Sequence, residues 1–317
     1  MKVTDATDAC GRVLGEVGSA VIADDEFLET VLAGVLADGH VLLEDVPGTG
    51  KTLTARSFAD ALGLDFRRIQ FTPDLLPADI TGSTIYDEST GGFTFQRGPI
   101  FANVVLADEI NRAPPKTQAA LLEAMGEGQV TVDRETYDLP DPFFVIATQN
   151  PVEQEGTFRL PEAQRDRFMF KTEMGYPDRA GERRLLDLRA DRTVSAPSVG
   201  RVLDEGTVSG MQAAVETVDV EGKLRDYIVD LARATREDSR VRVGVSPRGI
   251  QRTFEAVRAA AVLAGRDYAV PDDVKRVVRP VFAHRLVLTT EASVGDVDPH
   301  DVAEAVLDRV TVPPGAE

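Results

Sequence analysis

Tryptophan is absent from this 317-residue sequence, and cysteine occurs only once, as Cys10. A single cysteine excludes a disulfide framework and any cysteine-based zinc site. No apolar run in the sequence approaches the roughly 20 residues that a transmembrane helix needs. The N-terminus also lacks the basic start and the apolar stretch of a signal peptide. Together these absences predict a cytoplasmic protein without direct membrane insertion.

Lysine is scarce as well, since only six of the 35 basic residues are lysines, whereas Asp and Glu number 53 and the net charge is −18. A chain this acidic gains little from the counterion release that drives non-specific nucleic-acid binding, so we do not expect a nucleic-acid partner. Low lysine and abundant aspartate are typical of proteins from a high-salt cytoplasm, where charge repulsion is screened. A GC-rich genome also favours Arg and Asp, and both explanations stay open.

Helices and strands alternate in the first half of the chain. We expect helices over residues 24–38, 51–62 and 114–126, strands over 40–45, 66–71, 104–107 and 143–148, and hairpins around Gly91-Gly92 and Asp133-Arg134. This order predicts an α/β fold with a mostly parallel sheet and helices on both of its faces.

After residue 178 the pattern changes to helical segments alone. They span residues 179–190, 221–236, 247–264, 271–286 and 299–310. The sequence therefore predicts an α/β core over residues 1–177, a helical linker over 178–220 and a smaller all-α domain over 221–317.

Residues 45–52 carry the strongest chemical signal, a glycine-rich turn between an expected strand and an expected helix. Such a turn points backbone N–H groups at phosphates, and the helix N-terminus adds positive potential. This pattern predicts a P-loop that binds ATP, in which Lys51 reaches the terminal phosphates and the Thr52 hydroxyl ligates Mg²⁺. The predicted nucleotide-binding residues here are Pro47, Gly48, Thr49, Gly50, Lys51, Thr52 and Leu53. The formal pattern has glycine where this chain has Asp45, and a plain glycine turn beside an exposed lysine is the alternative.

Two acids follow the apolar strand expected at residues 104–107. Ligands of open α/β sheets bind at this carboxyl end of the strands. Asp108 is predicted to hold Mg²⁺, and Glu109 to polarise the attacking water. Asn150, after the last expected strand, could hold that water. Two carboxylates that cap the next helix, and an Asn that forms a turn before Pro151, are the competing interpretations.

Several longer segments resemble MoxR-type AAA+ ATPases. They are residues 69–82, 108–113, 118–125, 160–164, 246–248 and 283–286. The resemblance covers nearly the whole chain and implies an AAA+ P-loop core, a parallel sheet with flanking helices, followed by a smaller all-α lid domain. It also implies a Mg²⁺-dependent ATPase.

The resemblance further assigns roles to single residues. Asn150 matches the sensor 1 residue, Arg167 the arginine finger that enters a neighbouring subunit's site, and Arg248 the sensor 2 arginine of the lid. Val21 and Ile22 fall where the family lines its adenine pocket. The hairpin expected around Gly91-Gly92 matches a loop that the family inserts into its second helix, which is thought to face the central pore of a ring. The hairpin expected around Asp133-Arg134 matches the one that precedes sensor 1.

Three further arginines complicate the assignment of the finger. Arg165 stands where the family usually has an apolar residue, so that it competes with Arg167, and Arg159 replaces a usual proline. Arg112 is a weaker candidate for the subunit interface. An exposed salt bridge, worth under about 1 kcal/mol, is the alternative interpretation of each arginine.

The resemblance implies a homo-oligomer, a hexameric ring, that uses ATP to remodel partner proteins such as those with von Willebrand factor A domains. Three other functions stay open. They are a nucleic-acid motor of the same clade, an ATPase subunit of a metal chelatase, and a nucleotide-gated binding protein with little turnover. Glu109, Asn150 and Arg167 argue against the last of these.

Overall fold

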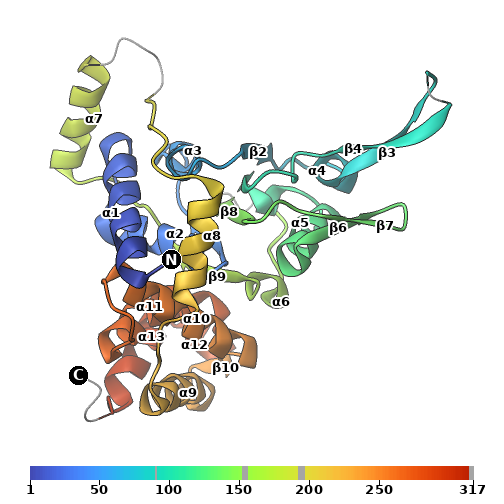
Figure 1. Ribbon diagram of the computed structural model, residues 1–317. Coiled ribbons are helices and arrows are strands. Elements are labelled where there is room, and N and C mark those ends of the chain that lie inside the picture. Colours follow the sequence, from blue (N-terminus) through green and yellow to red (C-terminus); the bar gives the residue numbers. More distant parts are fainter. Residues whose placement is uncertain (90, 152–155, 192–196, 314–317) are drawn as a thin grey trace.

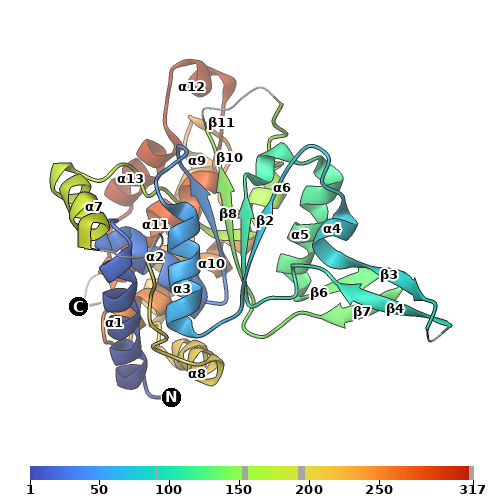
Figure 2. The same ribbon diagram turned by 90° about the horizontal axis from the view of Figure 1, so that it is seen from above.

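The computed structural model describes residues 1–89, 91–151, 156–191 and 197–313. Its centre is a five-stranded parallel sheet in the order β2-β5-β8-β1-β9 (Figures 1 and 2). The strands are β1 (His40–Glu44), β2 (Phe66–Gln70), β5 (Val104–Asp108), β8 (Phe144–Gln149) and β9 (Phe168–Thr172). The predicted α/β core with a parallel sheet is confirmed.

Helices cover both faces of this sheet because its central strands are apolar on both sides. Val41 and Leu43 of β1 pack on one face with α1 (Val3–Ala20), α2 (Asp25–Leu36) and α3 (Lys51–Leu62). Leu42 belongs to the apolar cluster of the other face, with residues of α4 (Pro77–Thr81) and α5 (Pro115–Glu127). Figure 2 shows these two helices on the side of the sheet away from α1 and α3. Each large side chain buried in this way stabilises the fold by about 1.5–3 kcal/mol.

Several elements of the core were not predicted, among them α1, α4 and β9. Helix α1 buries a stripe of small residues that includes Ala6, Ala9 and Val13, and this stripe is a weaker signal than one of Leu or Phe. Strand β9 has five residues and completes the sheet by pairing in parallel with β1.

The two predicted hairpins are confirmed. β3 (Gly82–Asp87) pairs with β4 (Gly92–Arg97), and β6 (Gln129–Val132) pairs with β7 (Glu135–Asp138). Asp133 and Arg134 turn the second hairpin with φ values of 50° and 71°, which a two-residue hairpin turn requires. The hairpins project together from the molecule (Figures 1 and 2), and Phe95 stacks on Tyr137 between them at 4.1 Å.

The C-terminal part contains the expected helices and two that were not expected. They are α7 (Arg179–Asp191), α8 (Glu205–Val215), α9 (Gly222–Glu237), α10 (Pro247–Leu263), α11 (Pro271–Phe282), α12 (Thr290–Val294) and α13 (Pro299–Arg309). Helices α8 and α12 are the unexpected ones. Among the described residues, no helix is both long and apolar enough to span a membrane.

This part is helical as predicted, except for one short pair of strands that was not expected. β10 (Val241–Val243) pairs antiparallel with β11 (Val287–Leu288), and α11 ends at Phe282, followed by the short 3₁₀ helix η2 (Ala283–Arg285). Strands of two or three residues are too short to show the alternation from which strands are predicted. One apolar cluster extends from α1 and α2 into α10 and α11. The boundaries after residues 177 and 220 stay a prediction.

Candidate nucleotide-binding site

The P-loop lies between the end of β1 and the start of α3. Gly48 and Gly50 have φ values of 87° and 104°, a left-handed conformation that side chains other than glycine rarely adopt. Gly50 is the N-cap of α3, so the helix begins at Lys51. The turn therefore presents backbone donors and the positive end of α3 to the same region.

Asp45 explains why the chain departs from the formal motif. Its carboxylate accepts hydrogen bonds from Val46 N at 2.8 Å, from Met174 N at 3.1 Å and from Gly175 N at 3.0 Å. The side chain is buried and joins the start of the P-loop to the segment after β9. A glycine would leave these three donors without this acceptor, so Asp45 is an anchor of the loop.

Lys51 is turned toward its own loop. Its Nζ donates to the carbonyl oxygens of Asp45 and Val46, at 2.8 Å each. Partial burial lowers the pKa of Lys51, and the nearby carboxylates of Asp45, Asp108 and Glu109 oppose this effect.

Asp108 is buried at the end of β5, where two side chains hold its carboxylate. The Thr148 hydroxyl donates to Oδ1 at 2.7 Å. Arg68, on the neighbouring strand β2, donates to Oδ2 through Nε at 3.0 Å and Nη2 at 2.6 Å. The Arg68 guanidinium thus occupies one carboxylate oxygen of Asp108, the acid predicted to bind Mg²⁺.

Glu109 has a left-handed backbone, with φ 56° and ψ 49°, which is strained for a residue with a side chain. Its N–H donates to Thr148 Oγ1 at 2.8 Å. Its Oε2 accepts from Gln70 Nε2 at 2.9 Å and from Arg112 Nη1 at 3.0 Å. Arg112, the weaker interface candidate, here contacts the acid of its own chain.

A cavity of about 440 Å³ brings most of the predicted residues together. It is lined by Pro47, Gly48, Gly50, Lys51, Thr52, Leu53, Arg68, Asp108, Glu109, Thr148, Gln149 and Asn150. Thr49 is not part of this lining, and its hydroxyl donates to Val46 O at 3.4 Å. The Thr52 hydroxyl and the Asp108 carboxylate fit Mg²⁺, which prefers oxygen ligands and keeps several waters when it binds beside phosphates.

Besides Thr49, four further predicted residues lie outside this lining. Val21 is buried in the core directly after α1, and Ile22 lies near Gly181 at the start of α7. Arg167 donates from Nη1 to Leu122 O of α5 in its own chain. Arg248 is exposed in the first turn of α10. The roles of these residues stay predictions.

Arg165 remains a competitor of Arg167 for the finger. It closes α6 (Glu162–Arg165), and its Nε is buried without a hydrogen-bond partner among the described residues.

The sequence analysis missed Arg68, Gln70 and Thr148. Two of them alternate on β2, and the third is the penultimate residue of β8, so a polar residue near the carboxyl end of a predicted strand was the available signal.

Comparison with known proteins agrees with this arrangement. Residues 40–170 match the ATPase family associated with various cellular activities (AAA), and residues 233–307 match the AAA lid domain. Over 311 residues the chain is 43% identical to the chaperone MoxR1 of Mycobacterium tuberculosis, covering 95% of this chain and 82% of that protein. Over 303 residues it is 45% identical to the uncharacterized protein YeaC of Bacillus subtilis, covering 96% and 94%.

A crystal structure of a candidate ATPase from Cytophaga hutchinsonii is similar with a TM-score of 0.91 and 38% identity. The similarity covers 98% of this chain and 97% of that one. With an AAA core, an AAA lid and MoxR relatives along nearly its whole length, the chain belongs to the MoxR family of AAA+ ATPases.

Proposed function

We propose that this protein hydrolyses Mg·ATP in the cavity beside the P-loop and uses the energy to remodel partner proteins. The observation that carries the proposal is that Lys51, Thr52, Asp108, Glu109 and Asn150 line one cavity. Lys51 and the loop amides would hold the phosphates, and Thr52 and Asp108 would hold Mg²⁺. The metal would neutralise charge on the phosphates when bound.

Hydrolysis requires a carboxylate that can accept a proton from water. Glu109 lies at the cavity and is already oriented by its strained backbone and by Gln70. Asn150, buried at the same edge of the sheet, would position the water. The remaining charge on the transferred group would be stabilised by Arg167 or Arg165 of a neighbouring subunit, which requires a homo-oligomer, in our proposal a hexameric ring.

Phosphate release and nucleotide binding, measured on the same preparations, test the enzymatic part. Lys51→Ala should abolish Mg·ATP binding. Glu109→Gln should retain binding and lose turnover by about 10²–10⁴-fold, the usual contribution of a general base. Wild-type turnover that Glu109→Gln leaves unchanged would contradict this role, and binding without turnover in the wild type would favour a nucleotide-gated binding protein.

The remodelling part rests on the family and on the similarity to MoxR1, a chaperone. We infer a cytoplasmic client, with a von Willebrand factor A domain protein as the first candidate. Glu109→Gln loaded with ATP should retain its client in a pull-down, and Lys51→Ala should not. Recovery of nucleic acid or of a chelatase subunit instead would support one of the alternative functions.

A further inference from the structure

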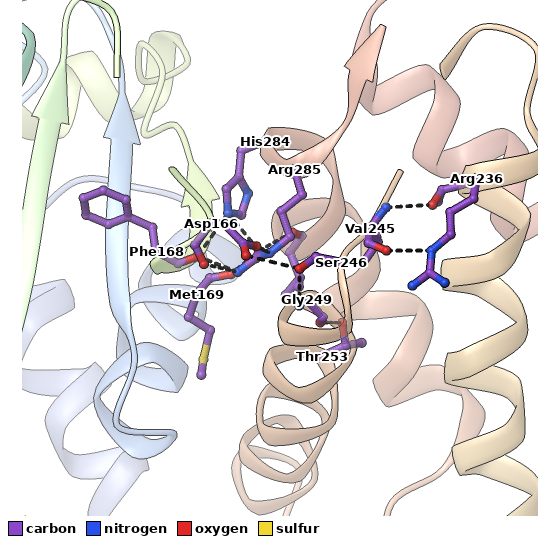
Figure 3. Close-up of polar contacts among 12 residues, drawn as sticks. Asp166, Phe168, Met169, Arg236, Val245, Ser246, Gly249, Thr253, His284 and Arg285 are labelled. Atoms are coloured by element: carbon purple, nitrogen blue, oxygen red, sulfur yellow. Dashed lines mark hydrogen bonds and ion pairs between the residues drawn. The ribbon is translucent and has the colours of Figure 1, made fainter. Parts of the chain in front are cut away.

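The lid and the core meet at a buried polar junction beside the candidate finger arginines. Arg285, in η2 of the lid, has a side chain that is only 1% exposed, and its Nε donates to Asp166 Oδ1 at 2.8 Å. Asp166 lies between Arg165 and Arg167 in the sequence. We call residues 165–167 the finger segment. The Asp166 carboxylate of this segment is therefore held by the lid, as Figure 3 shows.

Arg285 also holds the backbone that follows the finger segment. Its Nη2 donates to the carbonyl oxygens of Asp166 at 3.3 Å and Phe168 at 2.7 Å, and its Nη1 donates to Met169 O at 3.1 Å. His284 lies at hydrogen-bond distance from Phe168 O through Nε2, at 3.1 Å. The planar guanidinium thus binds three carbonyl oxygens of residues 166–169 at the start of β9, which the single ammonium group of a lysine could not do with the same geometry.

A second lid contact reaches the same carboxylate. Ser246 Oγ donates to Asp166 Oδ2 at 3.1 Å and accepts from Gly249 N at 3.0 Å as the N-cap of α10. Arg248 lies in this first helical turn, two residues after Ser246. The contact between Ser246 and Asp166 consequently joins the helical turn that carries Arg248, the predicted sensor 2 arginine, to the segment that carries the candidate finger.

The loop before α10 is itself fixed to the lid. Val245 N donates to Thr235 Oγ1 at 3.0 Å, and Arg236 Nε donates to Val245 O at 2.9 Å (Figure 3). Burial lowers the pKa of Arg285 to about 10, against the stabilising carboxylate of Asp166, so the guanidinium stays charged at neutral pH. The junction is a hydrogen-bonded ion pair and not a loose surface contact.

We propose that Arg285 is a positioning residue that makes the lid and the finger segment of one subunit move as a unit against the neighbour's nucleotide. This inference rests on the proposed function, because it requires an arginine that acts between subunits. It assigns to Arg285, Asp166 and Ser246 a coupling role that is separate from nucleotide binding in their own subunit.

Complementation between subunits tests this coupling. Arg285→Lys keeps the charge and loses the forked contacts, so its own cavity should bind Mg·ATP with unchanged affinity while its kcat falls on the order of 10²-fold, as for a misplaced reacting group. Glu109→Gln subunits are inactive but carry an intact junction and finger. Mixed with Arg285→Lys subunits, they should restore turnover in the Arg285→Lys cavities. A defect confined to the folding of one subunit would not be restored by mixing.

Two controls make the outcomes distinct. Arg266→Lys alters an Arg–Asp pair of the same kind within the lid, where Arg266 donates to Asp273 at 2.6 and 2.7 Å, and it should leave kcat unchanged. Arg167→Ala and Arg165→Ala, each mixed with Glu109→Gln, test the finger itself. If neither recovers activity, the intersubunit finger in the proposed function is wrong.

If a finger variant recovers in the mixture and Arg285→Lys does not, the coupling proposed for Arg285 is wrong. A weakened nucleotide affinity in Arg285→Lys, or an equal loss of kcat in Arg266→Lys, would also overturn it. Melting temperatures of all variants establish that they fold, and Asp166→Asn, which loosens the junction from the core side, replaces Arg285→Lys if that variant does not fold.

Discussion

At the scale of single residues, the P-loop depends on a side chain that its formal motif lacks. Asp45 accepts three backbone hydrogen bonds and connects the loop to residues 174 and 175. Its own φ is not positive, so the position does not require glycine. The carboxylate therefore has a structural role that the motif alone would not reveal.

We expect Asp45→Ala to lower the free energy of unfolding by about 1–3 kcal/mol, because buried donors lose an acceptor. Nucleotide affinity should fall with it, since Lys51 also contacts the carbonyl of this residue. Urea denaturation and nucleotide titration measure both effects. Asp45→Asn, which keeps one side-chain oxygen, is the matched control. An Asp45→Ala protein as stable as the wild type would contradict the anchoring role.

His40 supplies a pH dependence at the same scale. Its ring is buried between Met125 O, which lies 3.1 Å from Nε2, and Val145 N, which donates to Nδ1 at 3.1 Å. The Val145 donor leaves no room for a proton on Nδ1, so the neutral ring is required. Burial lowers the pKa of His40 from 6.5 to about 4.

The His40 ring is therefore protonated below about pH 6.5 in the unfolded chain but only below about pH 4 in the folded chain. The free energy of unfolding should therefore decrease as the pH falls below 6.5. His40 alone should account for a loss of about 2 kcal/mol at pH 5. Burial also lowers the pKa of His284, which acts in the same direction. Urea denaturation at pH 7 and pH 5 checks this, and His40→Gln should lose less stability over that interval. An identical pH dependence in both proteins would refute the assignment to His40.

At the scale of elements, an aromatic stack joins the two projecting hairpins. Phe95 of β4 lies on Tyr137 of β7, whereas Phe93, two residues earlier in the same strand, is 76% exposed. Aromatic pairs contribute about 0.5–1.5 kcal/mol beyond their buried area. The mutual position of the hairpins thus depends largely on Phe95.

Phe95→Ala should accelerate amide hydrogen exchange in both hairpins, because each loses its contact with the other. Phe93→Ala, matched in residue type and strand, should change exchange only near its own site. Hydrogen exchange measured segment by segment separates the two outcomes. Equal effects of the two substitutions on β6 and β7 would show that the stack does not join the hairpins.

At the scale of the whole molecule, the net charge of −18 is the dominant electrostatic property. Like charges on one compact chain repel each other, and this repulsion is relieved when the chain unfolds. The screening length falls from about 10 Å at 0.1 M salt to about 3 Å at 1 M salt. Salt should therefore stabilise the folded protein.

We expect the melting temperature to rise as KCl increases from about 0.1 M to about 1 M, the range over which screening becomes short. Thermal unfolding followed by circular dichroism measures this shift. Sucrose at equal osmolality is the control, since it is excluded from the protein surface but screens no charge. A melting temperature that falls or stays constant in KCl would exclude charge repulsion as a major contribution to the stability of the folded protein.

The α/β core, the P-loop and the two acids could all be predicted from the sequence. These signals lie in contiguous residues, because a strand, a turn and a helix N-terminus must follow one another for the phosphate site to form. Both hairpins were also predictable, since paired strands joined by a tight turn are local structures. Short elements such as β10 and β11 were not, because two or three residues carry no period.

The contacts between side chains of distant segments could not be predicted from the sequence. Thr148 reaches Asp108 across 40 positions, Arg285 reaches Asp166 across 119, and Asp45 reaches Met174 N across 129. Such pairs depend on the strand order β2-β5-β8-β1-β9 and on the docking of the lid. Periodicity shows which face of an element is buried, whereas the partner across that face is fixed by packing between elements that are distant in the chain.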